Sequence, residues 1–157
     1  MKKIFVFMIG FLGIISCTTD DNSSKNKIKV NFDKETFDKA RELWQEQNLQ
    51  NYTYTYDYFS SSGPYNYNVV VENGVVTSEE GSTIDNLFAN IESTYNSLVK
   101  EYENKNADLV TAVYYTITYN SQYHYPERFS VSYDYSELPP PGFGGSRSEI
   151  TNFYTTD

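Results

Sequence analysis

The chain's only histidine, His124, is the first residue to consider for proton transfer or metal binding. As a catalytic base it would need a nearby nucleophile, but the sequence has no Gly-x-Ser-x-Gly motif or comparable nucleophile context. A zinc site needs at least three good ligands, which one histidine cannot easily supply. The neighbours Tyr123, Tyr125 and Pro126 indicate a turn. We therefore predict a turn histidine, no catalytic residue, and neither a metal nor another cofactor.

Paired carboxylates offer a second chemistry, the hydrolysis of glycosidic bonds. Glu127, Asp134 and Glu137 could supply a pair, whose carboxyl groups would have to lie about 5 to 9.5 Å apart. The chain has 21 acidic side chains, so pairs of this kind arise without any catalytic role. A hydrolase that cleaves envelope or dietary glycans through Glu127 and Asp134 is therefore an alternative function and not the leading one.

Tyrosine is unusually frequent, with 16 residues in a chain of 157. A period of two predicts a strand with one tyrosine face, formed by Tyr52, Tyr54, Tyr56 and Tyr58. If helices leave that face open, it is a platform for sugar rings or an extended peptide, because tyrosine combines contact area with a polar tip at low entropy cost. The other possibility, which we favour, is that the row packs beneath Trp44 and Phe88.

The N-terminus predicts export and a lipid anchor. Lys2 and Lys3 precede an uncharged run over residues 4–15, which is too short for a transmembrane helix of about 20 residues. Residues 14–17, Ile-Ile-Ser-Cys, resemble the lipobox that the bacterial lipoprotein signal peptidase reads. We predict that residues 1–16 are removed and that acyl chains on Cys17, the only cysteine, hold the protein on a membrane. No thiol then remains for disulfides, metals or catalysis.

After the leader, the chain divides into a tether and one domain. Residues 17–31 comprise the lipidated cysteine and a polar stretch with almost no apolar content, which predicts a flexible tether. Residues 32–157 suffice for a single domain that buries about two-thirds of its surface. The net charge of the chain is −9, and loss of the two leader lysines makes the mature protein more acidic still. This charge disfavours nucleic acid and anionic lipid as partners.

Two segments show helical periodicity. Residues 32–48 place apolar side chains on one face and charged side chains on the other. The second segment keeps apolar residues at helical spacing for five turns, up to residue 102. The residues that mark the helix starts are Asp33 with the hydrophobic staple Phe32 and Phe37, and Ser82 or Thr83 with Asp85 placed for a capping box from Ser82.

Six other runs predict strands. The pair Asn73-Gly74 stands between two β-branched runs, and it predicts a tight hairpin because both central residues of a type I′ turn need positive φ. The predicted fold is α+β, an antiparallel six-stranded sheet with two helices packed on one face, in the order α-β-β-β-α-β-β-β. The strand runs are 52–58, 65–72, 75–77, 109–120, 128–136 and 148–155.

Four segments in residues 40–135 carry a family resemblance. They are Leu43-Trp44 with the aromatic strand 51–56, the hairpin 69–76, the helix start 83–91, and residues 117–119 leading to Tyr125-Pro126-Glu127. Their order and spacing resemble a family of uncharacterised secreted bacterial lipoproteins with a domain of unknown function. Members often carry cysteines after the aromatic strand, whereas residues 57–59 contain none here. The resemblance implies a fold and a compartment but no activity.

The residues after the anchor also bear on location. Residues 18–21, Thr-Thr-Asp-Asp, resemble the surface-export signals of some Bacteroidota lipoproteins, which implies the outer membrane, at its periplasmic face or at the cell surface. The leading hypothesis is a non-enzymatic, lipid-anchored envelope protein whose domain binds or scaffolds an envelope protein or a glycan. A carbohydrate-binding module that uses the tyrosine face, and a glycan hydrolase, are the alternatives.

Overall fold

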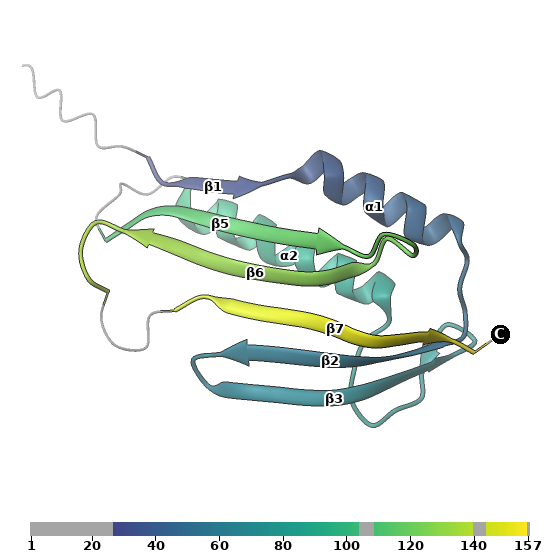
Figure 1. Ribbon diagram of the computed structural model, residues 1–157. Helices are drawn as coiled ribbons and strands as arrows, with labels where there is room; N and C mark the ends of the chain where they lie inside the picture. Colours follow the sequence, from purple (N-terminus) through teal and green to yellow (C-terminus); the bar gives the residue numbers. More distant parts are fainter. Residues whose placement is uncertain (1–26, 104–108, 140–143, 157) are drawn as a thin grey trace, which may run out of the picture.

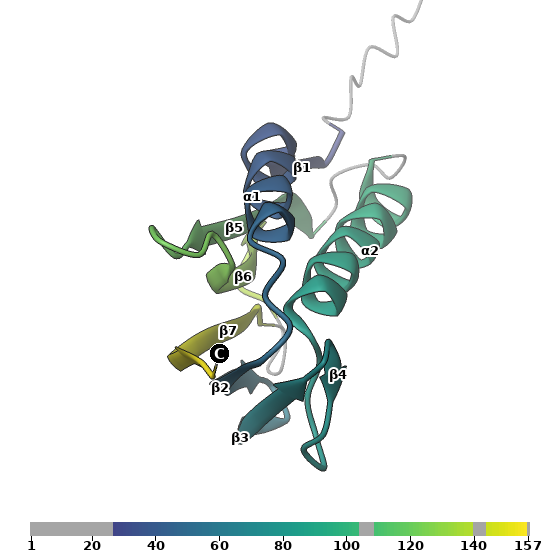
Figure 2. The ribbon, with the colours of Figure 1, turned by 90° about the vertical axis from the view of Figure 1, so that its right-hand side faces the viewer.

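The computed structural model describes residues 27–103, 109–139 and 144–156. These residues form one seven-stranded sheet, and two helices cover one of its faces (Figures 1 and 2). The strands lie side by side in the order β1-β5-β6-β7-β2-β3-β4. The elements are β1 (Lys29–Phe32), α1 (Lys34–Glu46), β2 (Tyr52–Ser60), β3 (Gly63–Glu72), β4 (Val75–Val76), α2 (Ile84–Tyr102), β5 (Val110–Tyr119), β6 (Pro126–Tyr135) and β7 (Ser146–Thr155).

The prediction of six antiparallel strands is wrong because it omits a seventh strand, β1, which precedes the first helix. The short strand β1 pairs in parallel with β5, in a register that runs from Lys29↔Ala112 to Phe32↔Tyr115, while the other neighbouring strands are antiparallel. Four residues give too little periodicity to predict a strand, and their partner lies about 80 residues later in the chain. The sheet therefore includes residues 29–31, which the sequence placed before the domain.

Both helices begin at capping residues. Asp33 accepts a hydrogen bond from the Thr36 backbone N–H (3.0 Å), and the predicted staple forms because the Phe32 and Phe37 rings lie 5.2 Å apart. At α2 the cap is Thr83, which accepts from the Asn86 N–H (3.1 Å). Of the two predicted caps, Thr83 is therefore the N-cap of α2, and Ser82 is not.

The Asn73-Gly74 hairpin is confirmed. Both residues have positive φ, 52° and 74°, as a type I′ turn requires. The turn joins β3 to β4 through the pairs Val71↔Val76 and Glu72↔Val75, so β4 is only two residues long. The Gly74 N–H also donates to the Gln50 carbonyl (2.9 Å), which ties the turn to the segment before β2.

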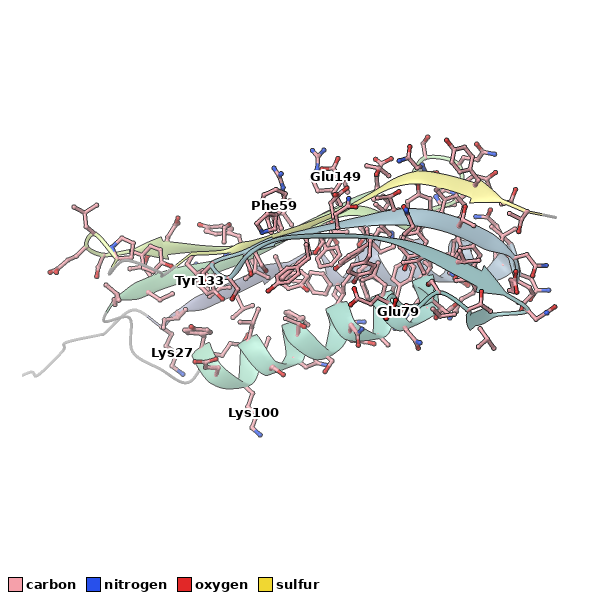
Figure 3. The ribbon with its side chains drawn as sticks, turned by 90° about the horizontal axis from the view of Figure 1, so that it is seen from below. Lys27, Phe59, Glu79, Lys100, Tyr133 and Glu149 are labelled. Atoms are coloured by element: carbon pink, nitrogen blue, oxygen red, sulfur yellow. The ribbon has the colours of Figure 1, made fainter. Side chains whose placement is uncertain are left out.

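The two faces of the sheet differ in chemistry. Along β2, Tyr52 and Tyr54 are buried beneath the helices, whereas the intervening Thr53 and Thr55 belong to the uncovered face. Figure 3 shows this division, with Tyr133 on the helix side of the sheet and Phe59 and Glu149 on the opposite side. The helix side therefore holds the hydrophobic core, and the opposite side is polar.

A bulge in β7 completes the core. The register of β7 with β2 shifts between Thr53 and Thr55, where Asn152 has a φ of 50°. The bulge directs Phe153 toward Trp44 of α1, with ring centroids 6.1 Å apart. The next residue, Tyr154, is then 63% exposed. Without the bulge, simple alternation from the buried Ile150 would bury Tyr154 and expose Phe153.

We expect Phe88→Ala to lower the free energy of unfolding by about 3–5 kcal/mol, because Phe88 is fully buried and its ring packs on Phe37 at 5.4 Å. Phe59→Ala is the matched control: this residue is 48% exposed on the uncovered face, and its loss should cost about 1 kcal/mol or less. Urea unfolding followed by the fluorescence of Trp44, the only tryptophan, measures both. Equal losses in the two variants would contradict this assignment of the core.

Candidate functional site

A cavity of about 250 Å³ lies between α2 and the helix side of the sheet. Strands β2, β3, β5 and β6 supply aromatic rings to it, and α2 supplies the opposite wall. The residues that line it are Tyr54, Tyr56, Tyr67, Ser82, Leu87, Asn90, Ile91, Thr94, Tyr115 and Phe129. In the described part of the chain, these residues form the best candidate for a ligand site.

The start of α2 is fixed by the tyrosine row of β2. The Tyr52 hydroxyl accepts the Ile84 backbone N–H (3.0 Å), and the Tyr54 hydroxyl donates to the Ser82 carbonyl. At its other end α2 reaches the far half of the sheet, where the Tyr102 and Tyr133 rings lie 6.2 Å apart. The helix therefore crosses from one half of the sheet to the other, and the cavity lies beneath its N-terminal half.

A small buried residue on β7 lies next to two of the rings that line the cavity. Ser148 is 1% exposed, and the sheet register places it between Tyr58 on β2 and Phe129 on β6. Its hydroxyl accepts a hydrogen bond from the Tyr56 hydroxyl (2.9 Å). A larger side chain at this position would occupy space between the neighbouring rings.

The wall contributed by α2 changes from apolar to polar toward the mouth. Leu87 and Ile91, one turn apart, are buried, whereas Asn90 and Thr94, also one turn apart, are exposed. Asn90 and Thr94 therefore stand at the rim, where the cavity meets solvent. Across the rim lies Tyr67 of β3, which is half-buried.

Among the polar groups at the cavity, the Tyr67 hydroxyl and the Asn90 amide have unused hydrogen-bonding capacity. The hydroxyls of Tyr54 and Tyr56 are engaged within the fold, and Tyr115 hydrogen-bonds Thr94. By contrast, none of the described residues forms a hydrogen bond with the Tyr67 hydroxyl or with the side-chain amide of Asn90. A ligand in the cavity could use both groups.

The tyrosines of the cavity are uncharged near neutral pH. Burial raises the pKa of Tyr54 and Tyr56, and it raises the pKa of Tyr115 to about 12. Burial also raises the pKa of Tyr67, with a smaller contribution from the negative charge of Glu80 nearby. The site thus presents neutral phenols, with a carboxylate on the Tyr67 side.

The structure separates the four tyrosines that the sequence grouped as a platform. Tyr52 is 1% exposed and Tyr54 3% exposed, and both serve α2, while Tyr52 packs on Trp44 with ring centroids 5.4 Å apart. Tyr56 and Tyr58 are half-buried, and Tyr58 packs against Tyr65 at 6.2 Å. All four belong to the helix side of the sheet, so they do not form one open row. Only Tyr54 and Tyr56 line the cavity.

The carboxylates proposed for hydrolysis lie far apart. Glu127 and Asp134 are both on β6, and seven steps along a strand span roughly 23 Å. Asp134 accepts the Tyr114 hydroxyl (2.9 Å) on the uncovered face, and Glu137 is exposed beyond the end of β6. Glu127 and Asp134 therefore do not form the carboxylate pair required for glycoside hydrolysis.

His124 lies in the tight turn between β5 and β6, as predicted. Its N–H donates to the Asn120 carbonyl (3.0 Å), and its φ of 62° is left-handed. The side-chain oxygen of Asn120 stabilises the same turn by accepting hydrogen bonds from the backbone N–H groups of Gln122 and Tyr123. Among the described residues, no three histidine, cysteine or acidic side chains are grouped so as to hold a metal ion. Cys17, the predicted lipidation site, lies outside the described residues.

The sequence did not predict four of the residues that line the cavity, Tyr67, Asn90, Thr94 and Tyr115. One signal could have pointed to two of them: Asn90 and Thr94 are polar positions next to the apolar stripe of α2. No local pattern shows that Tyr67 and Tyr115, on two strands that are not neighbours, face the same space.

The fold and the cavity define the class of small mixed α+β domains in which helices on one face of a sheet enclose a space of ligand size. The chain belongs to the family of unknown function DUF6174, whose family model matches residues 36–137. This range ends before β7, the central strand of the sheet. No curated protein and no solved structure gives a significant match. The resemblance to an uncharacterised family is confirmed at this level, while lipid anchoring and a Bacteroidota origin stay predictions.

None of the helices in the described residues is long and apolar enough to cross a bilayer.

We expect the domain to lose stability as the pH rises above about 10. Burial raises the pKa of Tyr52, Tyr115 and Tyr125 to about 12, whereas unfolded tyrosines ionise near 10. Between these values the folded state binds more protons, so the free energy of unfolding should fall by at most about 1.4 kcal/mol per pH unit per tyrosine. Below pH 10 this contribution is fully present. The urea midpoint at a series of pH values from 9 to 12 measures the loss.

Tyr115→Phe should reduce this alkaline slope, because it removes one of the buried phenols. Tyr154→Phe, which changes an exposed residue, is the control and should leave the slope as it is. A stability that does not change between pH 10 and 12 would contradict the burial of these hydroxyls.

Proposed function

We propose that this protein is a lipid-anchored binding module of the bacterial cell envelope. The apolar run over residues 4–15 and the Ile-Ile-Ser-Cys sequence that ends at Cys17 support removal of a leader and acylation of Cys17. Acyl chains on Cys17 would hold the domain at a membrane, and the residues that follow favour the outer membrane. The polar residues 18–26 would serve as part of the tether between the anchor and the domain.

The observation that carries the binding role is the cavity beneath α2. It combines aromatic rings with two polar groups, the Tyr67 hydroxyl and the Asn90 amide, that have no hydrogen-bond partner among the described residues. Binding sites for small molecules are typically apolar hollows with a few convergent polar groups. The lining residues supply stacking surface and hydrogen bonds, which hold a ligand in place.

A binding role is favoured over hydrolysis by the positions of the acids. Glu127 and Asp134 lie near opposite ends of β6, and neither lines the cavity. The partner we expect is a glycan or a segment of an envelope protein that offers a group small enough to enter the cavity. A carbohydrate partner is supported by the number of aromatic rings around it.

The anchor is tested by replacing its cysteine. In cells that express the full-length chain and are fed labelled palmitate, Cys17→Ala should abolish incorporation of the label and release the protein from the membrane fraction. Ser24→Ala, close to the same site, is the control and should be labelled like the wild type. Undiminished labelling of Cys17→Ala would disprove the anchor.

The cavity is tested by closing its mouth. The full-length chain, extracted in a detergent without a sugar headgroup, is applied to an array of glycans and peptides. Asn90→Trp should abolish specific binding, because Asn90 is exposed at the rim and a tryptophan there would block entry without replacing a core residue. Ala89→Trp puts the same side chain on the neighbouring exposed position of α2, which does not line the cavity. It should bind like the wild type.

An array on which no compound binds would contradict the binding role. Binding that survives in Asn90→Trp would place the ligand elsewhere on the domain.

A further inference from the structure

We infer that the cavity beneath α2 receives one uncharged sugar ring, with its apolar face on the aromatic side chains and its hydroxyls toward Tyr67 and Asn90. This inference rests on the proposed binding role and adds the chemical class of the ligand.

The size of the cavity suits a single substituted ring. A cavity of about 150 Å³ holds a benzene molecule, and this one has about 250 Å³. The additional volume accommodates the substituents of one six-membered ring, and it is too small for a chain of several sugars. Because the cavity opens at Asn90 and Thr94, the remainder of a longer glycan would continue into solvent.

The rings around the cavity provide the stacking surface. Tyr56 and Tyr67 pack side by side on neighbouring strands, with ring centroids 5.3 Å apart and planes inclined by 32°. Phe129 and Tyr115 approach from the other half of the sheet. The C–H groups on one face of a sugar are apolar and can pack on aromatic faces, while its hydroxyls remain at the edge.

The free polar groups match sugar hydroxyls. The amide of Asn90 offers two donors and one acceptor, and the Tyr67 hydroxyl offers a donor and an acceptor. Each sugar hydroxyl likewise donates and accepts, so neighbouring hydroxyls can bind the amide at two points. A purely apolar ligand would leave the half-buried Tyr67 hydroxyl without a partner where it excludes water.

The charge of the site favours a neutral ring. All the described residues that line the cavity are uncharged near neutral pH, and none of them is a cation that could balance a carboxylate or phosphate. Glu80 lies close enough to Tyr67 to raise the pKa of its hydroxyl, so this negative charge would repel an anion. Neutral sugars are therefore preferred to sugar acids.

The test is a titration of the full-length chain, in a detergent without a sugar headgroup, followed by saturation-transfer NMR. The probes are D-glucose, D-galactose and N-acetyl-D-glucosamine. Cyclohexanol serves as a ring with a single hydroxyl, and D-glucuronate as a charged ring. We expect at least one of the neutral sugars to bind, with cyclohexanol and glucuronate at least tenfold weaker.

Four variants locate the sugar. Tyr67→Phe and Asn90→Ala should each weaken its binding about three- to tenfold, the loss expected for one hydrogen bond. Asn90→Trp should abolish the binding and Ala89→Trp should leave it unchanged. Because Tyr67→Phe removes one oxygen atom and preserves the ring, its effect does not depend on a disturbed fold.

Two outcomes overturn the inference. Binding of cyclohexanol with no binding of sugars would assign the cavity to apolar rings, and sugar binding that Asn90→Trp does not affect would assign the sugar to another surface. The binding role itself would survive either result if an array ligand still required an open cavity, as shown by its loss in Asn90→Trp. The assignment of binding to this cavity fails if no ligand of any class depends on Asn90, and the binding role itself fails only if no compound binds at all.

Discussion

The structure depends on how the buried hydroxyls of β2 are satisfied. A phenol that leaves water must keep a hydrogen-bond partner, or its burial costs about 1–3 kcal/mol. Tyr52 and Tyr54 meet this requirement with the backbone at Ser82 and Ile84, on either side of the Thr83 cap. The same contacts that stabilise two buried tyrosines therefore set where α2 begins and how it lies over the sheet. The aromatic core beneath the helix forms only with α2 in this place.

The cavity follows from the same arrangement. Tyrosine rings from β2, β3 and β5 lie between the sheet and the N-terminal half of α2, and the cavity is the space that they leave there. Helix α1 supports α2 from the side, because Trp44 donates to Asp85 (3.3 Å) and Arg41 donates to Glu92 (2.8 Å). The tyrosines of β2 and the two helices thus form both the core and the candidate site.

The site residues could be predicted from the sequence only in part. The alternating row of β2 correctly predicted a strand with one tyrosine face, and two of its four members line the cavity. The sequence could not show which members a helix covers, because that depends on the path of α2. Nor could it show that Tyr67 and Tyr115 converge, since their strands are separated in the sheet by three others. The separation of Glu127 and Asp134 became clear only once both were placed on one strand.

The sequence by itself determined the features that depend on neighbours a few residues apart. These are the cap at Asp33, the staple of Phe32 and Phe37, the Asn73-Gly74 turn, the two helices and most of the strands. Only the tertiary structure decided the parallel pairing of β1 with β5, the central position of β7 and the bulge at Asn152. The physical reason is the separation along the chain between the residues that interact. Caps, turns and periodicity arise from local hydrogen bonds and side-chain spacing, whereas β1 meets β5 and β2 meets β7 across about 80 to 100 residues of chain, where pairing is selected by burial of the whole aromatic face.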